Sequence, residues 1–125
     1  MKKLILKSPG FEMGEIELTP EQLPVVLGRS KKVGIRIKDE LLSREHSEIR
    51  MNAAGQFEIA DCDSMNLTIV NKHDVTSHVL QDGDEILLGE TEILVHVEMP
   101  AGTLNDQTTR DLTIVPGNSD ETIGN

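Results

Sequence analysis

The chain has 125 residues, with 12 Lys and Arg against 22 Asp and Glu, which gives a net charge of −10. This length fits one domain and a tail, and the hydrophobic share of 37% is ordinary for a globular protein. No apolar run approaches the roughly 18 residues of a membrane span. The apolar run behind the basic Met1-Lys2-Lys3 is too short for a signal peptide.

Cysteine and aromatic content narrow the function classes further. Cys62 is the only cysteine, so no intramolecular disulfide can form and a reducing cytoplasmic location is expected. Phe11 and Phe57 are the only aromatic residues, too few for a base-stacking platform. Since a strongly acidic chain also repels a polyanion, neither a nucleic acid nor a membrane is an expected partner.

Short segments of apolar and polar alternation predict strands through most of the chain. Turn residues separate nearly all of them, which is typical of a β-sandwich or barrel. Thr19 followed by Pro20 predicts a single helical turn over Pro20–Leu23. The predicted strands are 3–7, 15–18, 23–27 ending at Gly28, 34–38, 46–51, 57–60, 67–70, 85–88 and 93–97.

The last 26 residues have a different composition. Residues 100–125 are rich in Gly, Thr, Asn and Asp, with one apolar cluster at Leu112, Ile114 and Val115. They contain two similar fragments, 111–114 and 120–123, which chance also explains. We predict a folded domain over residues 1–98 and a disordered acidic tail or linker over 99–125.

Charge is unevenly distributed along the chain. Residues 28–50 carry seven bases and four acids, a local charge of +3 on an otherwise acidic protein. Ordinary solvated strands explain this by themselves, and a local anion site is the alternative.

Three separated segments supply the groups that such a site needs. Gly28-Arg29 ends one strand, the stretch from Ser43 to His46 leads into another, and residues 61–66 precede a third. We expect Gly28 to adopt a backbone angle that other residues avoid. If these loops meet at one end of a sandwich, they offer a guanidinium, a hydroxyl and an amide, which suit a phosphate monoester on a peptide.

Four motifs in order resemble the forkhead-associated (FHA) domain family. They are Gly-Arg at 28–29, Ser-Arg-Glu-His at 43–46, Asp-Cys-Asp-Ser-Met-Asn-Leu-Thr at 61–68 and Gln-Asp-Gly-Asp from residue 81. The resemblance covers residues 3–98 and implies an all-β sandwich of about eleven mostly antiparallel strands. It also implies binding of phosphothreonine peptides through loops at one end, without a cofactor.

The resemblance assigns roles to single residues. Arg29 and Ser43 would contact the phosphate, and Arg44 would contact the phosphate or a flanking ligand residue. Asn66 would hydrogen-bond the peptide backbone, and Asn71 would help to hold the peptide.

Two further positions, Gly28 and His46, would be structural. From charge rather than resemblance, Lys31 and Lys32 would steer the phosphate.

Two residues depart from the family pattern. Met65 replaces a Thr or Ser that offers the phosphate a further hydroxyl, and Leu67 replaces a Gly. Losing one hydrogen bond to a charged group costs about 1.5–3 kcal/mol. We favour retained phosphothreonine binding, and a phosphate-independent interaction scaffold with a degenerate site is the alternative.

The sequence supports a catalytic or metal-binding function less well than phosphothreonine recognition. Ser43 and His46 lack an orienting acid, and acidic neighbours disfavour the Cys62 thiolate. The Asp82–Asp84 hairpin lacks the spacing of a calcium loop. We therefore expect no enzyme and no metal, and we expect the remaining histidines to be solvated: His73, His78 and His96.

The expected partner is a protein phosphorylated on threonine by an upstream Ser/Thr kinase. The chain's own tail is a second candidate once phosphorylated, because tethering raises its effective concentration. Its acceptor candidates are Thr108, Thr109, Thr113 and Thr122.

Overall fold

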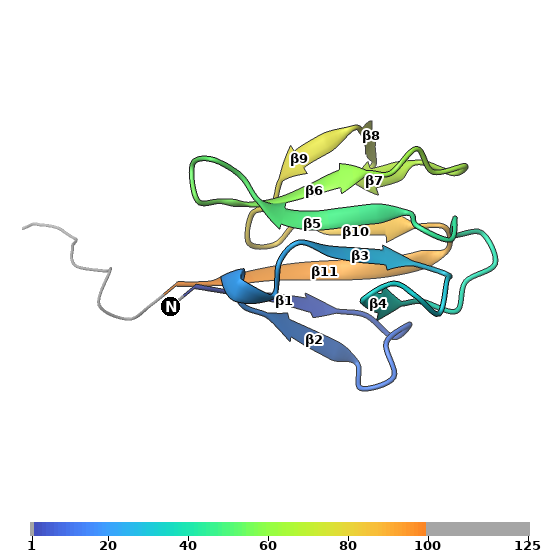
Figure 1. The fold of residues 1–125 in the computed structure, drawn as a ribbon, viewed down its shortest axis with the longest axis horizontal. Coiled ribbons are helices and arrows are strands. Elements are labelled where there is room, and N and C mark those ends of the chain that lie inside the picture. The colour runs from blue at the N-terminus through green and yellow to red at the C-terminus, as the bar shows by residue number, and fades with distance from the viewer. Residues whose placement is uncertain (1, 100–125) are drawn as a thin grey trace, which may run out of the picture.

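The computed structural model describes residues 2–99, which form two β-sheets packed face to face (Figure 1). The six-stranded sheet has the order β2 (Glu15–Leu18), β1 (Lys3–Lys7), β11 (Thr91–Glu98), β10 (Glu85–Leu88), β7 (Thr68–Val70) and β8 (His73–Val75). The five-stranded sheet has the order β4 (Ile35–Arg36), β3 (Val25–Gly28), β5 (Ser47–Met51), β6 (Phe57–Asp61) and β9 (Ser77–Val79). Paired strands are antiparallel except β3 with β4. The predicted all-β sandwich of eleven strands is confirmed.

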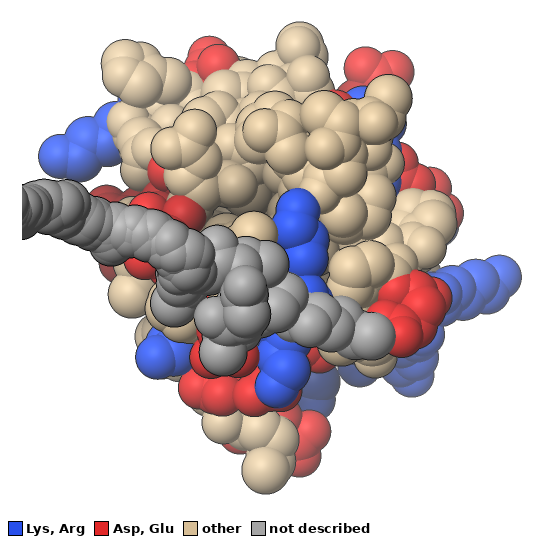
Figure 2. All heavy atoms as spheres, turned by 90° about the vertical axis from the view of Figure 1, so that its left-hand side faces the viewer, with Lys and Arg blue, Asp and Glu red and all other residues tan. Residues whose placement is uncertain are grey.

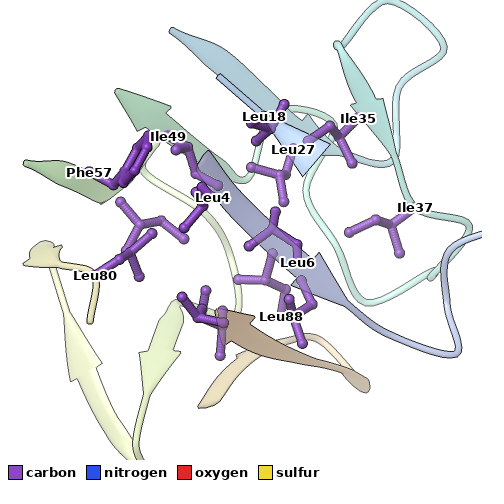
Figure 3. Packing of buried hydrophobic residues seen from close by; sticks show 14 of the residues in the cluster. Leu4, Leu6, Leu18, Leu27, Ile35, Ile37, Ile49, Phe57, Leu80 and Leu88 are labelled. Atoms are coloured by element: carbon purple, nitrogen blue, oxygen red, sulfur yellow. The ribbon is translucent and has the colours of Figure 1, made fainter. Parts of the chain in front are cut away.

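The core lies between the sheets and is built from side chains that point inward from the strands of both sheets (Figure 3). Leu4 and Leu6 of β1 are fully buried, as are Leu27 and Ile49 of the opposite sheet. Because side chains alternate across a strand, Glu48 and Arg50 on either side of Ile49 face outward. The rigid double layer fixes where each connecting loop begins and ends.

Strands β8 and β9 escaped prediction from the sequence. Both are edge strands of three residues with largely exposed polar side chains, so they have no hydrophobic periodicity. The predicted helical turn is a 3-10 helix at Pro20–Gln22, where the Thr19 amide donates to Gln22 Oε1 at 2.7 Å. Within residues 2–99 this turn is the only helix, and it is too short to cross a membrane. Residues 100–125 of the predicted tail lie outside the described residues.

Strand directions bring three connections to one end of the sandwich. They join β3 to β4 (residues 29–34), β4 to β5 (37–46) and β6 to β7 (62–67), and together we call them the loop face. At the opposite end lie the β7–β8 turn and the β9–β10 connection, residues 71–72 and 80–84. The three motif segments therefore converge as the sequence predicts.

Candidate functional site

The first two loops of the loop face run side by side. The amides of Arg29 and Ser30 donate to the carbonyls of Ser43 and Arg44, at 3.1 and 3.2 Å. A Cβ on Gly28 would lie 2.0 Å from the Arg44 carbonyl oxygen, so no other residue fits. The φ of Gly28 is outside the left-handed region, so the expected unusual angle was wrong. Close backbone packing is the reason for this glycine.

Arg29 projects from the end of β3 with its head group already oriented. Its Nε donates to the Leu42 carbonyl at 3.0 Å, and the side chain is otherwise exposed. No hydrogen bond from its Nη groups to residues 2–99 is found, so both terminal nitrogens can face a ligand. A guanidinium held in this way suits a phosphate, because its terminal donors match two phosphate oxygens.

Ser43 is tied to its neighbours through its acceptor, which leaves its proton for a ligand. Its Oγ accepts the Met65 amide at 2.9 Å. Its own amide donates to Nδ1 of His46 at 3.0 Å, and His46 Nε2 donates to the Leu67 carbonyl at 2.8 Å. His46 is fully buried and neither ring nitrogen meets the Ser43 hydroxyl. The two residues therefore form no nucleophile–base pair, and His46 ties the β4–β5 loop to the β6–β7 loop.

The β6–β7 loop reaches across the site through Asn66. Its Nδ2 donates to the Leu41 carbonyl at 2.6 Å, which leaves one N–H and the Oδ1 acceptor for a peptide backbone. The next residue, Leu67, has a φ of +69°, the left-handed conformation that glycine adopts without strain. The loop thus keeps the shape that the missing glycine would give, at a cost in backbone strain.

Asp61 organises the same loop from below and was given no role from the sequence. Its carboxylate accepts the Ser64 amide at 3.0 Å, the Ser64 hydroxyl, and the Thr68 hydroxyl at 2.7 Å. Because the Thr68 proton goes to Asp61, Ser47 donates in the 2.7 Å contact with Thr68. Burial raises the pKa of Asp61, but the bonds from Ser64 and Thr68 outweigh it and leave this pKa below its ordinary value. An ionised Asp61 therefore holds the loop in place.

Asp39 plays a similar part in the β4–β5 loop and was also missed. Its carboxylate accepts the Leu41 amide at 2.9 Å, and the Glu90 amide and Thr91 hydroxyl at 2.8 Å each. These contacts tie the loop to the β10–β11 turn. The available signal was an Asp at the start of a turn, which bonds the amide two residues later.

The structure brings most of the predicted residues to the loop face and leaves one out. Arg44 and Lys31 lie on it with exposed side chains. Asn71 lies at the other end of β7, where Nδ2 donates to Asp84 at 2.9 Å and Oδ1 accepts the Glu85 amide at 3.0 Å. Three strand residues, about 10 Å, separate it from the β6–β7 loop. We therefore correct its predicted role in holding the peptide to stabilisation of the β7–β8 turn.

At the opposite end, polar groups pair with one another. His78 Nε2 contacts Asp84 at 3.0 Å and His96 pairs with Asp82, partners that the sequence did not predict, while the two side chains keep 32 and 44% of their surface exposed. Asp84 is only 8% exposed, and its carboxylate also accepts the Gln81 amide at 2.8 Å. Figure 2 shows this end, where Lys and Arg alternate with Asp and Glu below a largely uncharged region.

Cys62 is partly buried near acidic side chains. Burial and the acidic side chains of Glu48 and Asp61 raise the pKa of the Cys62 thiol, which disfavours a reactive thiolate. Among residues 2–99, no three His, Cys, Asp or Glu side chains are placed to hold a metal ion.

Comparison with known proteins gives a single family. The family model of the FHA domain matches residues 25–89. The oxoglutarate dehydrogenase inhibitor of Corynebacterium efficiens is 39% identical over 74 residues, which are 59% of this chain and 51% of that protein. The glycogen accumulation regulator GarA of Mycolicibacterium smegmatis is 37% identical over 67 residues, 54% of this chain and 42% of GarA. The chain thus spans about half the length of the curated relatives it matches.

Solved structures agree with this match. A structure from a study of phosphothreonine-dependent FHA domain interactions is 32% identical, with a TM-score of 0.67 over 75% of this chain and 95% of that one. The FHA domain of FhaA, solved in complex with the intracellular domain of Rv3910, is 31% identical, with a TM-score of 0.64 over 74% and 99%. The loop-face geometry thus lies on a fold whose solved examples include a phosphothreonine-dependent one.

Proposed function

Because the chain belongs to the FHA domain family, we propose that its loop face binds a phosphothreonine in a partner protein. Binding would then depend on phosphorylation of that partner, which makes the protein a recognition module in signalling. The relatives named above support a regulatory rather than catalytic role, since one is named an inhibitor and another a regulator.

The observation that carries this proposal is the unused bonding capacity of three side chains on one face. Arg29 keeps its Nη donors, Ser43 its hydroxyl proton, and Asn66 one N–H and its carbonyl oxygen. The first two suit a phosphate dianion, and the third suits an extended peptide backbone. Met65 offers no hydroxyl at its position, so Arg29 and Ser43 supply the main phosphate contacts.

The test is a paired titration. A phosphothreonine peptide selected from an oriented library, and the same peptide unphosphorylated, are titrated into the protein by calorimetry. We expect a dissociation constant of about 1 μM for the phosphorylated peptide and no measurable binding of the other. Arg29→Ala should remove binding, because truncating one partner of a charged pair costs about 2–5 kcal/mol. Lys72→Gln, a loss of positive charge at the opposite end, is the matched control and should leave affinity unchanged.

A phosphate-independent scaffold is the second candidate, and one observation favours it. Leu41, Met65 and Leu67 expose 45, 85 and 44% of their surface on the same loops. Exposed apolar side chains of this size are typical of protein contacts. Equal binding of both peptides in the titration, unaffected by Arg29→Ala, would support the scaffold and contradict the phosphothreonine reader.

The finer partner and domain predictions belong to the same proposal. An upstream Ser/Thr kinase would create the ligand, residues 1–98 would form the binding domain, and the cytoplasm would be its location. The tail, 99–125, would be a competing ligand when phosphorylated. Chemical-shift mapping with a phosphorylated tail peptide tests this, and unperturbed signals of Arg29 and Asn66 would contradict it.

A further inference from the structure

We propose that Arg36 forms a second anion subsite beside Arg29, so that the preferred ligand carries another negative group about two or three residues from its phosphothreonine. This inference rests on the proposed function and names the ligand class of the same face. It concerns a residue that neither the motifs nor the sequence analysis singled out.

Arg36 is positioned by the short strand β4. Its neighbours Ile35 and Ile37 are buried, at 5 and 1% exposure, so the alternation of strand side chains turns Arg36 outward. Parallel pairing with β3 sets Arg36 directly beside Gly28. From there its Nε donates to the Arg29 carbonyl at 3.2 Å. One hydrogen bond thus anchors Arg36 to the residue that would bind the first phosphate.

The two arginines are held in the same way. Each uses Nε on a backbone carbonyl, Leu42 for Arg29 and Arg29 for Arg36, and neither Nη pair is bonded to residues 2–99. One guanidinium belongs to residue 29 and the other is bonded to its carbonyl. The two head groups therefore lie within about one extended side chain of each other. Extended peptide covers such a span in about two or three residues, at ~3.3 Å per residue.

The charge balance supports a bound anion rather than an internal partner. None of the six bases between residues 29 and 44 forms an ion pair within the described part of the chain. Lys3 and Arg50 pair with glutamates, and Lys2, Lys7 and Lys72 form no ion pair among residues 2–99 either, so the clustering of the six bases is what distinguishes them. In a protein of net charge −10, unpaired bases gathered on one face leave a local positive potential. These six are Arg29, Lys31, Lys32, Arg36, Lys38 and Arg44.

Carboxylates beside the β4–β5 loop give this potential a direction. A hollow of about 470 Å³ between the β4–β5 loop and the β10–β11 turn is lined by Asp39, Glu40 and Glu90, with Lys38 the single base. These carboxylates disfavour an anion there. The second negative group is therefore expected on the Arg36 side, where the chemistry fits either an Asp or Glu side chain or a second phosphate.

The experiment compares ligands and variants in one matrix. A library-selected phosphothreonine peptide with alanine at three positions on each side is the reference. Asp, and separately phosphothreonine, is introduced at each flanking position, and each peptide is titrated into wild type, R36Q, R36K and the charge-matched control K72Q. We expect one flanking position to raise wild-type affinity about three- to tenfold with Asp and further with phosphate. Comparing the affinity gained with Asp and with phosphothreonine shows whether a carboxylate or a second phosphate is the preferred second anion.

The variants separate this subsite from the first one. R36Q should leave affinity for the reference peptide within about twofold and remove the gain, whereas K72Q should retain it. R36K keeps the charge but loses the Nε anchor, so an intermediate gain is expected. Thermal melting confirms that each variant is folded.

Other outcomes would overturn the inference. These are no gain from a second anion at any position, a gain that survives in R36Q, or an equal loss of affinity for all peptides in R36Q. Arg36-dependent binding of anionic lipid vesicles, without a gain among the peptides, would also overturn it in favour of a membrane. If wild type binds no phosphothreonine peptide at all, the proposed function itself fails, which is a distinct result.

Discussion

The two ends of the sandwich use the same kinds of polar residue differently. At the opposite end, Asp84 accepts from Asn71, Gln81 and His78, and Asp82 pairs with His96. On the loop face, carboxylates hold the backbone, as Asp39 and Asp61 do, while the terminal nitrogens of Arg29 keep no partner among residues 2–99. Polar side chains that satisfy one another stabilise a turn, whereas side chains that keep free donors can bind a ligand.

The chain thus separates the groups that shape the loops from the groups available to a ligand. Asp61, Ser64 and Thr68 form a hydrogen-bond network at the base of the β6–β7 loop, whereas Asn66 of the same loop bonds outside this network to the Leu41 carbonyl. Asp39 supports the β4–β5 loop in a similar way, because its carboxylate accepts the Leu41 amide. Such inner support lets an exposed loop keep one shape without using the binding donors.

Changing Gly28 should have the largest effect on this arrangement. In Gly28→Ala the new Cβ would overlap the Arg44 carbonyl, so the β3–β4 and β4–β5 loops must separate. We expect a loss of about 3 kcal/mol in the free energy of unfolding, measured by urea denaturation, together with loss of phosphopeptide binding. Gly14→Ala is the control, because its Cβ meets nothing within 4 Å and only its φ of +80° is strained. Equal costs for both substitutions would contradict the role of close packing.

Asp84→Ala should have the next largest effect, and it should change only stability. It leaves the Asn71 amide and the Gln81 N–H without their acceptor, which costs about 2–3 kcal/mol. Asp74→Ala on the exposed edge strand β8 should cost little. Phosphopeptide affinity should not change in either variant, and a loss in Asp84→Ala would mean that the two ends are coupled.

The ionisation of Asp84 should also make the stability of the fold depend on pH. Burial raises the pKa of Asp84, but bonds from Asn71, Gln81 and His78 outweigh it and leave this pKa below its ordinary value. A lowered folded-state pKa adds stability above the unfolded value of about 3.9, and this stability is lost as the pH falls through the folded value. Wild type should therefore lose more stability than Asp84→Ala between about pH 5 and pH 2. Parallel acid titrations of the two proteins would contradict this.

Ser43→Ala should have a smaller effect, confined to the loop face. It removes the hydroxyl donor for the phosphate and the acceptor of the Met65 amide. Affinity for the phosphopeptide should fall about tenfold or more, equivalent to about 1.5 kcal/mol. Ser77→Ala on β9 is the control, and similar affinities of the two variants would remove Ser43 from the site.

Leu67→Gly should have the smallest effect, and it should be stabilising. Glycine adopts the φ of +69° without strain, so we expect a gain of about 1 kcal/mol in the free energy of unfolding. Leu67→Ala keeps the strain and should give no gain. Comparing peptide affinity in both variants shows whether the Leu67 side chain itself contacts the ligand.

Much of the site was accessible from local sequence, and the supporting contacts were not. Arg29, Ser43 and Asn66 stand out because their motifs occur in order along the chain. Asp39 and Arg36 belong to no such motif. Asp39 reaches the β10–β11 turn, far away in sequence, and Arg36 is placed beside Gly28 by strand pairing. Asn71 was misplaced because a motif states order along the chain and not the end of the strand at which a residue lies.

Sequence alone determined the all-β class, most strands and the basic segment, because strand periodicity and turn chemistry are local properties. Tertiary structure decided which donors stay free, since this depends on contacts between loops that no local pattern encodes. It also showed that Gly28 is needed for close packing rather than for its backbone angle, and that Leu67 keeps a glycine-like conformation. The long-range hydrogen bond from His46 Nε2 to the Leu67 carbonyl, with the bonds that Asp61 accepts from Ser64 and Thr68, imposes that loop shape on a residue that does not favour it.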